Sequence, residues 1–94
     1  MLRKKLERKT MMDLNDQELA LLKVLANEWE KSGPPGFLET TVIAKELKVT
    51  ILDAKSIIHS LFVKGFVGTD KVDIYAAYLT PEGYAISKPA TNSN

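Results

Sequence analysis

His59 is the only histidine in this 94-residue sequence, and the chain has no cysteine. A catalytic triad needs an activated nucleophile beside the histidine and a carboxylate behind it, and the sequence has no Gly-x-Ser-x-Gly elbow to supply one. A zinc site needs cysteines or several more histidines, and the acidic residues are too dispersed for a calcium loop or paired carboxylates. The sequence therefore predicts no enzyme, no metal site and no cofactor.

Binding chemistry is concentrated in a helix that the sequence predicts from Ile51 to about Lys64. Thr50 is its expected N-cap, with Asp53 three residues on, and Gly65 is its expected end. Apolar residues three and four apart define the buried face, Ala54, Ile57, Ile58 and Leu61. The opposite face then carries Leu52, Asp53, Lys55, Ser56, His59, Ser60 and Val63. Its hydroxyl and ammonium groups can bond phosphates or base edges, but the helix has no arginine.

A second strong helix signal lies earlier in the chain. Asn15 is an expected N-cap, and Glu18 three residues later can return the hydrogen bond as a capping box. Gly33 is the expected end of this helix. Its predicted buried stripe contains Leu19, Leu22, Leu25, Ala26 and Trp29, with Leu21 and Val24 widening it. A shorter helix that ends near Lys48 is expected to be capped by Thr40 or Thr41.

The chain after Gly65 is predicted to form a hairpin and one more short helix. Two β-rich runs, residues 66–69 and 74–79, flank the polar tip 70–73. Thr80 is the expected N-cap of this short helix, and Pro81 would take its first position. Glu82 would then lie at the positive end of the helix dipole. Tyr84 and Ile86 give this helix an apolar side, and Pro89 is expected to end it.

Two sets of residues carry a resemblance to a known superfamily. The first set is Ile43-Ala44, Leu47, Val49-Thr50, Ala54, Ile58, Leu61 and Gly65-Phe66-Val67, and the second is Leu79-Thr80-Pro81-Glu82-Gly83. Across roughly residues 15–87 the chain resembles the winged helix-turn-helix superfamily, in particular MarR- and PadR-like transcriptional regulators. Lys48 stands where the turn often carries glycine.

The resemblance implies an α+β fold with a three-helix core, a two- to three-stranded antiparallel wing sheet and a short C-terminal helix. Phe37-Leu38 would form the short first strand of that sheet. Residues 51–64 would be the recognition helix, which places Thr50, Lys55, Ser56 and His59 near base edges and phosphates. Lys71 would lie at the tip of the wing. Members of these families commonly form homodimers, so a homodimer is expected.

The charge of the chain is divided unequally along it. Residues 1–12, a basic arm or short helix, contain five basic residues against Glu7, a net charge of +4. Residues 13–94 contain eight lysines, eleven acids and no arginine, a net charge of −3. This division predicts a basic arm 1–12, one domain at 13–88 and a polar, disordered tail 89–94. Nucleic-acid-binding domains are usually basic, so the acidic domain weighs against DNA binding.

No apolar run approaches the roughly 20 residues of a membrane span, and no apolar segment follows the basic N-terminal residues as in a secretory signal. A cytoplasmic protein without membrane contact is therefore expected.

Two functions remain open from the sequence. The first is a small DNA-binding transcriptional regulator, whose residues 51–64 enter the major groove of double-stranded DNA. Its basic arm would contact phosphates through Arg3, Lys4, Lys5 and Arg8. The alternative is a protein–protein interaction module, or a subunit of a complex, that does not bind DNA. The acidic domain and the exposed apolar candidates Leu52 and Val63 favour this alternative. A small-molecule effector also remains open.

Overall fold

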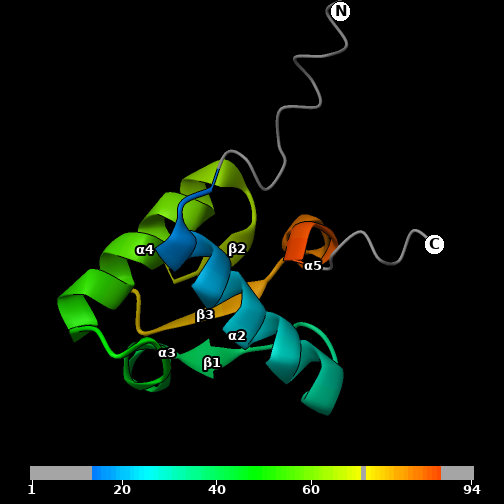
Figure 1. The fold of residues 1–94 in the computed structure, drawn as a ribbon, viewed down its shortest axis with the longest axis horizontal. Coiled ribbons are helices and arrows are strands. Elements are labelled where there is room, and N and C mark those ends of the chain that lie inside the picture. The colour runs from blue at the N-terminus through cyan, green and yellow to red at the C-terminus, as the bar shows by residue number, and fades with distance from the viewer. Residues whose placement is uncertain (1–13, 71, 88–94) are drawn as a thin grey trace, which may run out of the picture.

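The computed structural model describes residues 14–70 and 72–87. In these residues the chain forms four helices and a three-stranded antiparallel sheet (Figure 1). The elements in chain order are α2 (Asp16–Ser32), β1 (Leu38–Glu39), α3 (Thr40–Leu47), α4 (Ile51–Lys64), β2 (Val67–Thr69), β3 (Ala76–Leu79) and α5 (Pro81–Ser87). The predicted α+β class is confirmed. The predicted arm 1–12 and tail 89–94, with Pro89, lie outside the described residues.

Helix α2 begins and ends where its local signals predict. The amide of Glu18 donates to Asn15 Oδ1 at 2.8 Å, and the amide of Asn15 donates to Glu18 Oε1 at 2.9 Å, so the capping box is complete. Gly33 ends the helix with a φ of 93°. Leu21, expected at the margin of the buried stripe, is fully buried. The reason is that α2 is covered on several sides, by α3, α4, α5 and β3.

The start of α3 differs from the prediction that Thr40 or Thr41 caps it. Glu39 is the N-cap residue, and no side chain makes a capping hydrogen bond. The hydroxyl of Thr40 instead donates to the carbonyl of Ile74 at 2.6 Å, and its amide donates to the carbonyl of Tyr75 at 2.7 Å. Strand β1 runs directly into α3, so these bonds hold the start of α3 against the segment before β3. The predicted strand Phe37–Leu38 lies one residue later, at Leu38–Glu39.

The turn between α3 and α4 places a lysine in a left-handed backbone conformation. Lys48 has φ 59° and ψ 46°, and its amide bonds back to the carbonyls of Ala44 and Lys45. This conformation costs an L-residue about 1–2 kcal/mol, whereas glycine adopts it freely. The chain therefore keeps the turn geometry without the usual glycine, at some cost in stability.

Replacing Lys48 by glycine is expected to raise the free energy of unfolding by up to about 1 kcal/mol, because glycine removes the left-handed strain. Urea unfolding followed by circular dichroism measures the change. Lys45→Gly, one turn earlier inside α3, is the matched control. It should lower stability by about 1 kcal/mol, since glycine disfavours a helix interior. A loss of stability in Lys48→Gly as large as in Lys45→Gly would contradict the expectation.

Helix α4 confirms its predicted bounds and buried face. Thr50 Oγ1 accepts a hydrogen bond from the amide of Asp53 at 3.0 Å, and Gly65 ends the helix with a φ of 87°. The side chains that α4 buries are the four predicted ones, Ala54, Ile57, Ile58 and Leu61. They enter the core that α2 and α3 also line, while the opposite face of α4 remains open.

The sheet has the order β1-β3-β2, with β3 antiparallel to both neighbours. Ala77 and Leu79 of β3 are buried, whereas Tyr78 between them is exposed, as the alternation of a strand requires. Strand β3 begins later than predicted, at Ala76, because Ile74 has a φ of 53° and is not extended. In Figure 1, α3 and α4 lie near one end of the sheet and α5 lies beyond the other end of β3.

Helix α5 closes the fold against α2. Thr80 Oγ1 accepts a hydrogen bond from the amide of Gly83 at 3.0 Å and donates one to the carbonyl of Gly65 at 2.9 Å, so the predicted cap is confirmed. The ring of Tyr84 stacks on Trp29 with centroids 4.3 Å apart and an interplanar angle of 8°. Trp29 is thus a packing aromatic between two helices, as the sequence predicted.

Candidate functional site

The open face of α4 is the candidate site, because it gathers the polar side chains that the sequence analysis selected. Ser56 and His59 are exposed, Lys55 is half-buried, and Thr50 lies exposed at the start of the helix. The large apolar side chains Ile51, Leu52, Phe62 and Val63 are exposed on the same helix. The face is therefore polar in the middle and apolar at both ends.

Two of the predicted contact residues already have partners within the chain. The hydroxyl oxygen of Thr50 accepts the capping bond from Asp53, which leaves its hydrogen available to donate. The ammonium of Lys55 lies 5.9 Å from the ring centroid of Tyr75, a cation–π distance. This contact joins α4 to the segment that leads into β3. The hairpin and α4 therefore present neighbouring surfaces.

The described tip of the β2–β3 hairpin is acidic and apolar. Asp70 Oδ1 accepts a hydrogen bond from the amide of Tyr75 at 2.8 Å. Desolvation raises the pKa of the Asp70 carboxyl. Hydrogen bonds from backbone amides, first that of Tyr75, outweigh this effect and hold the pKa below its ordinary value. The carboxylate is therefore ionised at neutral pH. Val72 and Tyr75 beside it are strongly exposed, and Lys71, the predicted basic contact of the tip, lies outside the described residues.

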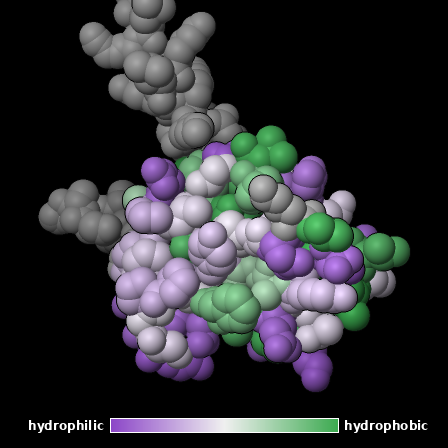
Figure 2. Space-filling view, turned by 180° about the vertical axis from the view of Figure 1, so that it is seen from behind, coloured by the Kyte–Doolittle hydropathy of each residue, from purple (hydrophilic) through white to green (hydrophobic). Residues whose placement is uncertain are grey.

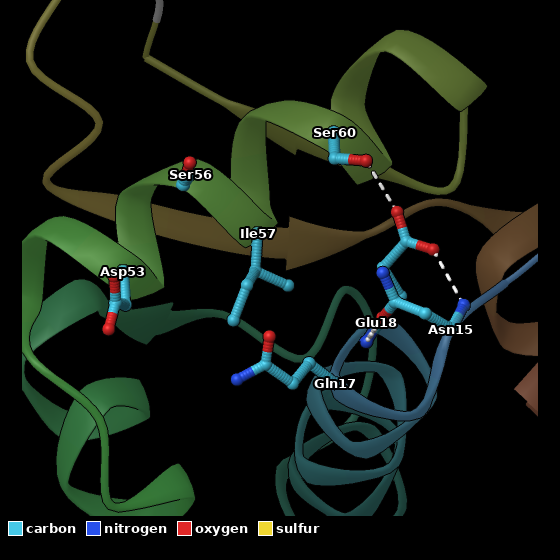
Figure 3. A pocket seen from close by; sticks show the side chains of 7 residues that line it. All are labelled: Asn15, Gln17, Glu18, Asp53, Ser56, Ile57 and Ser60. Carbon is cyan, nitrogen blue, oxygen red and sulfur yellow. Dashed lines mark hydrogen bonds between the residues drawn. The ribbon is translucent and has the colours of Figure 1, made fainter.

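A hollow of about 340 Å³ lies between the N-terminal end of α2 and α4 (Figure 3). Asn15, Gln17 and Glu18 line it from the α2 side, and Asp53, Ser56, Ile57 and Ser60 line it from α4. Figure 3 shows the Ser60 hydroxyl and the main-chain amide of Asn15 bonded to the carboxylate of Glu18. The polar side chains in this hollow are therefore partly committed to holding the two helices together.

The Glu18 carboxylate is the centre of that attachment. The Glu18 side chain is 3% exposed. It accepts hydrogen bonds from the Ser60 hydroxyl and from Lys64 Nζ, which lies 3.0 Å from each carboxylate oxygen. The sequence predicted a role for Glu18 only in the cap of α2. The prediction that Ser60 lies on the outward face is wrong, because Ser60 is half-buried and its hydroxyl donates to Glu18. No local signal in the sequence joins these residues, which are 42 and 46 positions apart.

The pKa of the Glu18 carboxyl reflects two opposing causes. Burial raises this pKa, because the charged form loses water. Hydrogen bonds from Ser60 and the Asn15 amide, and then the hydrogen bond and charge of Lys64, lower it. The sum is a pKa below the ordinary value of 4.5. Glu18 therefore binds its proton less readily in the folded chain than in the unfolded chain, and its ionisation stabilises the fold.

The contribution of Glu18 is expected to disappear in acid. It is fully present above the unfolded-state pKa and is lost as the pH falls through the lower folded-state pKa. The stability difference between the wild type and Glu18→Gln should therefore stay constant from about pH 7 to about pH 5.5 and shrink below about pH 4.5. Urea unfolding of both chains at several pH values measures this difference. The contributions of the other carboxyl groups are the same in both chains and cancel. A difference that grows on acidification would contradict the expectation.

The described domain is acidic. Residues 14–70 and 72–87 contain six lysines, ten carboxylates and no arginine, a formal charge of −4. One of the six, Lys64, forms the ion pair with Glu18. The predicted basic contacts Arg3, Lys4, Lys5 and Arg8 lie outside the described residues. Figure 2 shows hydrophobic side chains among hydrophilic ones on the face turned away from the viewer in Figure 1.

Three further observations limit the chemistry of the described residues. In residues 14–70 and 72–87, no group of three or more His, Cys, Asp and Glu side chains is placed to hold a metal ion. No helix in that part of the chain is long and apolar enough to cross a membrane. No buried side-chain nitrogen or oxygen there lacks a hydrogen-bond partner.

No protein-family model, no curated protein and no solved structure matches this chain.

Proposed function

We propose that the chain is a winged helix that binds double-stranded DNA as a transcriptional regulator, with α4 as the helix that enters the major groove. The observation that carries this proposal is the open face of α4, where Ser56 and His59 are exposed and the β2–β3 hairpin lies alongside. The order of α2, α3 and α4, the tight turn at Lys48 and the pairing of β1 with β3 support the winged-helix part of the proposal.

The polar middle of α4 supplies the groove contacts in this proposal. Ser56 and His59 are exposed and within one turn of each other, and both can bond a base edge or a phosphate. Lys55, half-buried beside Tyr75, lies at the margin of this face. A helix of 14 residues spans about 21 Å, long enough to lie along the groove.

In this proposal, most of the affinity for DNA comes from residues 1–12. The described domain carries −4, so it repels phosphates, whereas the arm carries +4. Arg3, Lys4, Lys5 and Arg8 are therefore the proposed phosphate contacts. Because such contacts release counterions, the affinity should fall steeply as salt is raised.

Fluorescence anisotropy against random duplex DNA at two salt concentrations tests the proposal. The full chain should bind at low salt, and removal of residues 1–12 should weaken binding at least tenfold and flatten the salt dependence. Ser56→Ala combined with His59→Ala should weaken binding further, while Thr41→Ala, on the exposed surface of α3, should not. Absence of binding by the full chain at low salt would overturn the proposal.

A second candidate function is a protein-interaction module that uses the same face. The observation that favours it is the exposure of large apolar side chains at both ends of α4, together with Val72 and Tyr75 at the hairpin. Exposed apolar groups that cluster on one surface typically mark a contact with another protein. Binding of the full chain to duplex DNA at physiological salt would count against this candidate.

A further inference from the structure

We propose that the partner for the open face of α4 is α4 of a second copy of this chain, packed antiparallel about a twofold axis between Ser56 and His59. This inference rests on the second candidate function, because it names the protein that the face contacts. The arguments are the spacing of the exposed residues, their symmetry and their charge.

The exposed apolar side chains of α4 form two pairs, one at each end of the helix. Ile51 and Leu52 in the first turn are 46% and 75% exposed, and Phe62 and Val63 in the last turn are 38% and 69% exposed. Leu52 and Val63 are largely open to water, whereas Ile57, Ile58 and Leu61 of the same helix are buried. Neither pair contributes to the buried core.

The residues on the outermost face follow the spacing of a helix-pairing seam. Leu52, Ser56, His59 and Val63 are separated by four, three and four positions. Side chains at these intervals lie in one line along a helix, and the same alternation of three and four defines the contact seam of paired helices. Ser56, in the middle of the seam, is small enough to let two helices approach closely.

The seam is self-complementary when one copy is reversed. The pair Leu52 and Val63 and the pair Ser56 and His59 share one midpoint, between Ile57 and Ile58. An antiparallel second copy centred there brings Leu52 opposite Val63 of the other chain, and Ser56 opposite its His59, twice each. A twofold interface requires this reciprocity. Ile51 and Phe62 flank the same ends and extend the apolar contact.

Charge favours a second copy over a charged partner. The four seam residues carry no carboxylate or ammonium, so pairing them buries no ion. Lys64 is directed to Glu18, and Lys55 lies beside Tyr75, away from the line of the seam. A specific interface removes roughly 1,000 Å² or more from water, and a pair of single 14-residue helices offers a small surface for that. The dimer should therefore be weak and depend on concentration.

Pairing through α4 covers Ser56 and His59, the proposed groove contacts. Pairing through α4 and insertion of the same face into a DNA groove are therefore mutually exclusive.

Light scattering of the full chain across roughly a hundredfold concentration range tests the pairing. The mass should rise from that of the 10.5 kDa monomer towards twice that value. Leu52→Glu and Val63→Lys should each weaken dimerisation at least tenfold, because each places a charge against an apolar side chain. The double variant should recover dimerisation, because the introduced carboxylate and ammonium meet across the twofold axis. Phe37→Glu, at an exposed apolar residue just before β1, is the matched control and should dimerise like the wild type.

All three positions are exposed, so circular dichroism should report an unchanged fold in every variant. A chain that is monomeric at every concentration would overturn the pairing. A dimer that survives both single changes, or a double variant that dimerises no better than either single one, would also overturn it. If the single changes abolish only duplex binding and leave dimerisation unchanged, the open face of α4 binds DNA and not a second copy. The outcomes are separable from the DNA proposal, because anisotropy on the same variants can fail while dimerisation persists.

Discussion

Glu18→Ala is expected to lower the free energy of unfolding by about 2–3 kcal/mol. Glu18 is a buried carboxylate that joins α2 to α4 through Ser60 and Lys64, and it completes the cap of its own helix. Alanine removes these bonds together and leaves the half-buried hydroxyl of Ser60 without its acceptor. The loss stays below that of a fully buried ion pair, because the Lys64 side chain is 35% exposed and can return to water. Urea unfolding measures the change.

Two controls separate the network from the loss of a helical glutamate. Glu46→Ala, on the exposed surface of α3, should change stability by less than about 0.5 kcal/mol. Ser60→Ala should cost about 1 kcal/mol, since one hydrogen bond of the network is lost. If Glu18→Ala costs no more than Glu46→Ala, the contacts between α2 and α4 do not stabilise the fold in the way described.

Gly83→Ala is expected to destabilise the fold by about 3 kcal/mol or more, although alanine is ordinarily favoured over glycine inside a helix by about 1 kcal/mol. A Cβ on Gly83 would lie 2.0 Å from the carbonyl oxygen of Phe66 and 3.1 Å from Leu79 Cδ1. The obstacle is backbone, so relief requires α5 to move away from the turn after α4. Such a shift would also disturb the stack of Tyr84 on Trp29.

Gly68→Ala is the comparison for this prediction. A Cβ on Gly68 would meet the ring of Tyr78 at 2.2 Å, but Tyr78 is an exposed side chain that can rotate outward. The cost should therefore be about 1 kcal/mol and should fall further in Gly68→Ala combined with Tyr78→Ala. Thermal unfolding followed by circular dichroism ranks the variants. A Gly83→Ala chain as stable as the wild type would show that α5 does not approach the Phe66 carbonyl this closely.

The helices of the described chain were predictable because their signals are local. Asn15, Thr50 and Thr80 each cap a helix by bonding an amide three residues ahead, and Gly33 and Gly65 end helices by their own backbone freedom. The buried face of α4 was predictable for a similar reason, since the spacing of apolar residues along one helix is visible in the sequence. The same periodicity placed Ser56 and His59 on the open face, where the structure also has them.

The errors occurred where a side chain has its partner in a distant segment. Threonine is a residue type that often caps helices, yet the Thr40 hydroxyl donates to the carbonyl of Ile74, 34 residues away. The position of Ser60 along α4 predicts an outward side chain, yet its hydroxyl donates a hydrogen bond to the buried carboxylate of Glu18. Periodicity describes one element and contains no information on what packs beside it.

The sequence by itself determined the order of the helices, most of their ends, the α+β class and the residues of the α4 face. It did so through caps, glycines and periodicity, which act within a few residues. Only the tertiary structure decided that Glu18 joins α2 to α4, that Lys55 lies beside Tyr75, and that α5 approaches the Phe66 carbonyl so closely that residue 83 must be glycine. These contacts join residues 17 to 46 positions apart, and they form only when packing of the core brings those segments together.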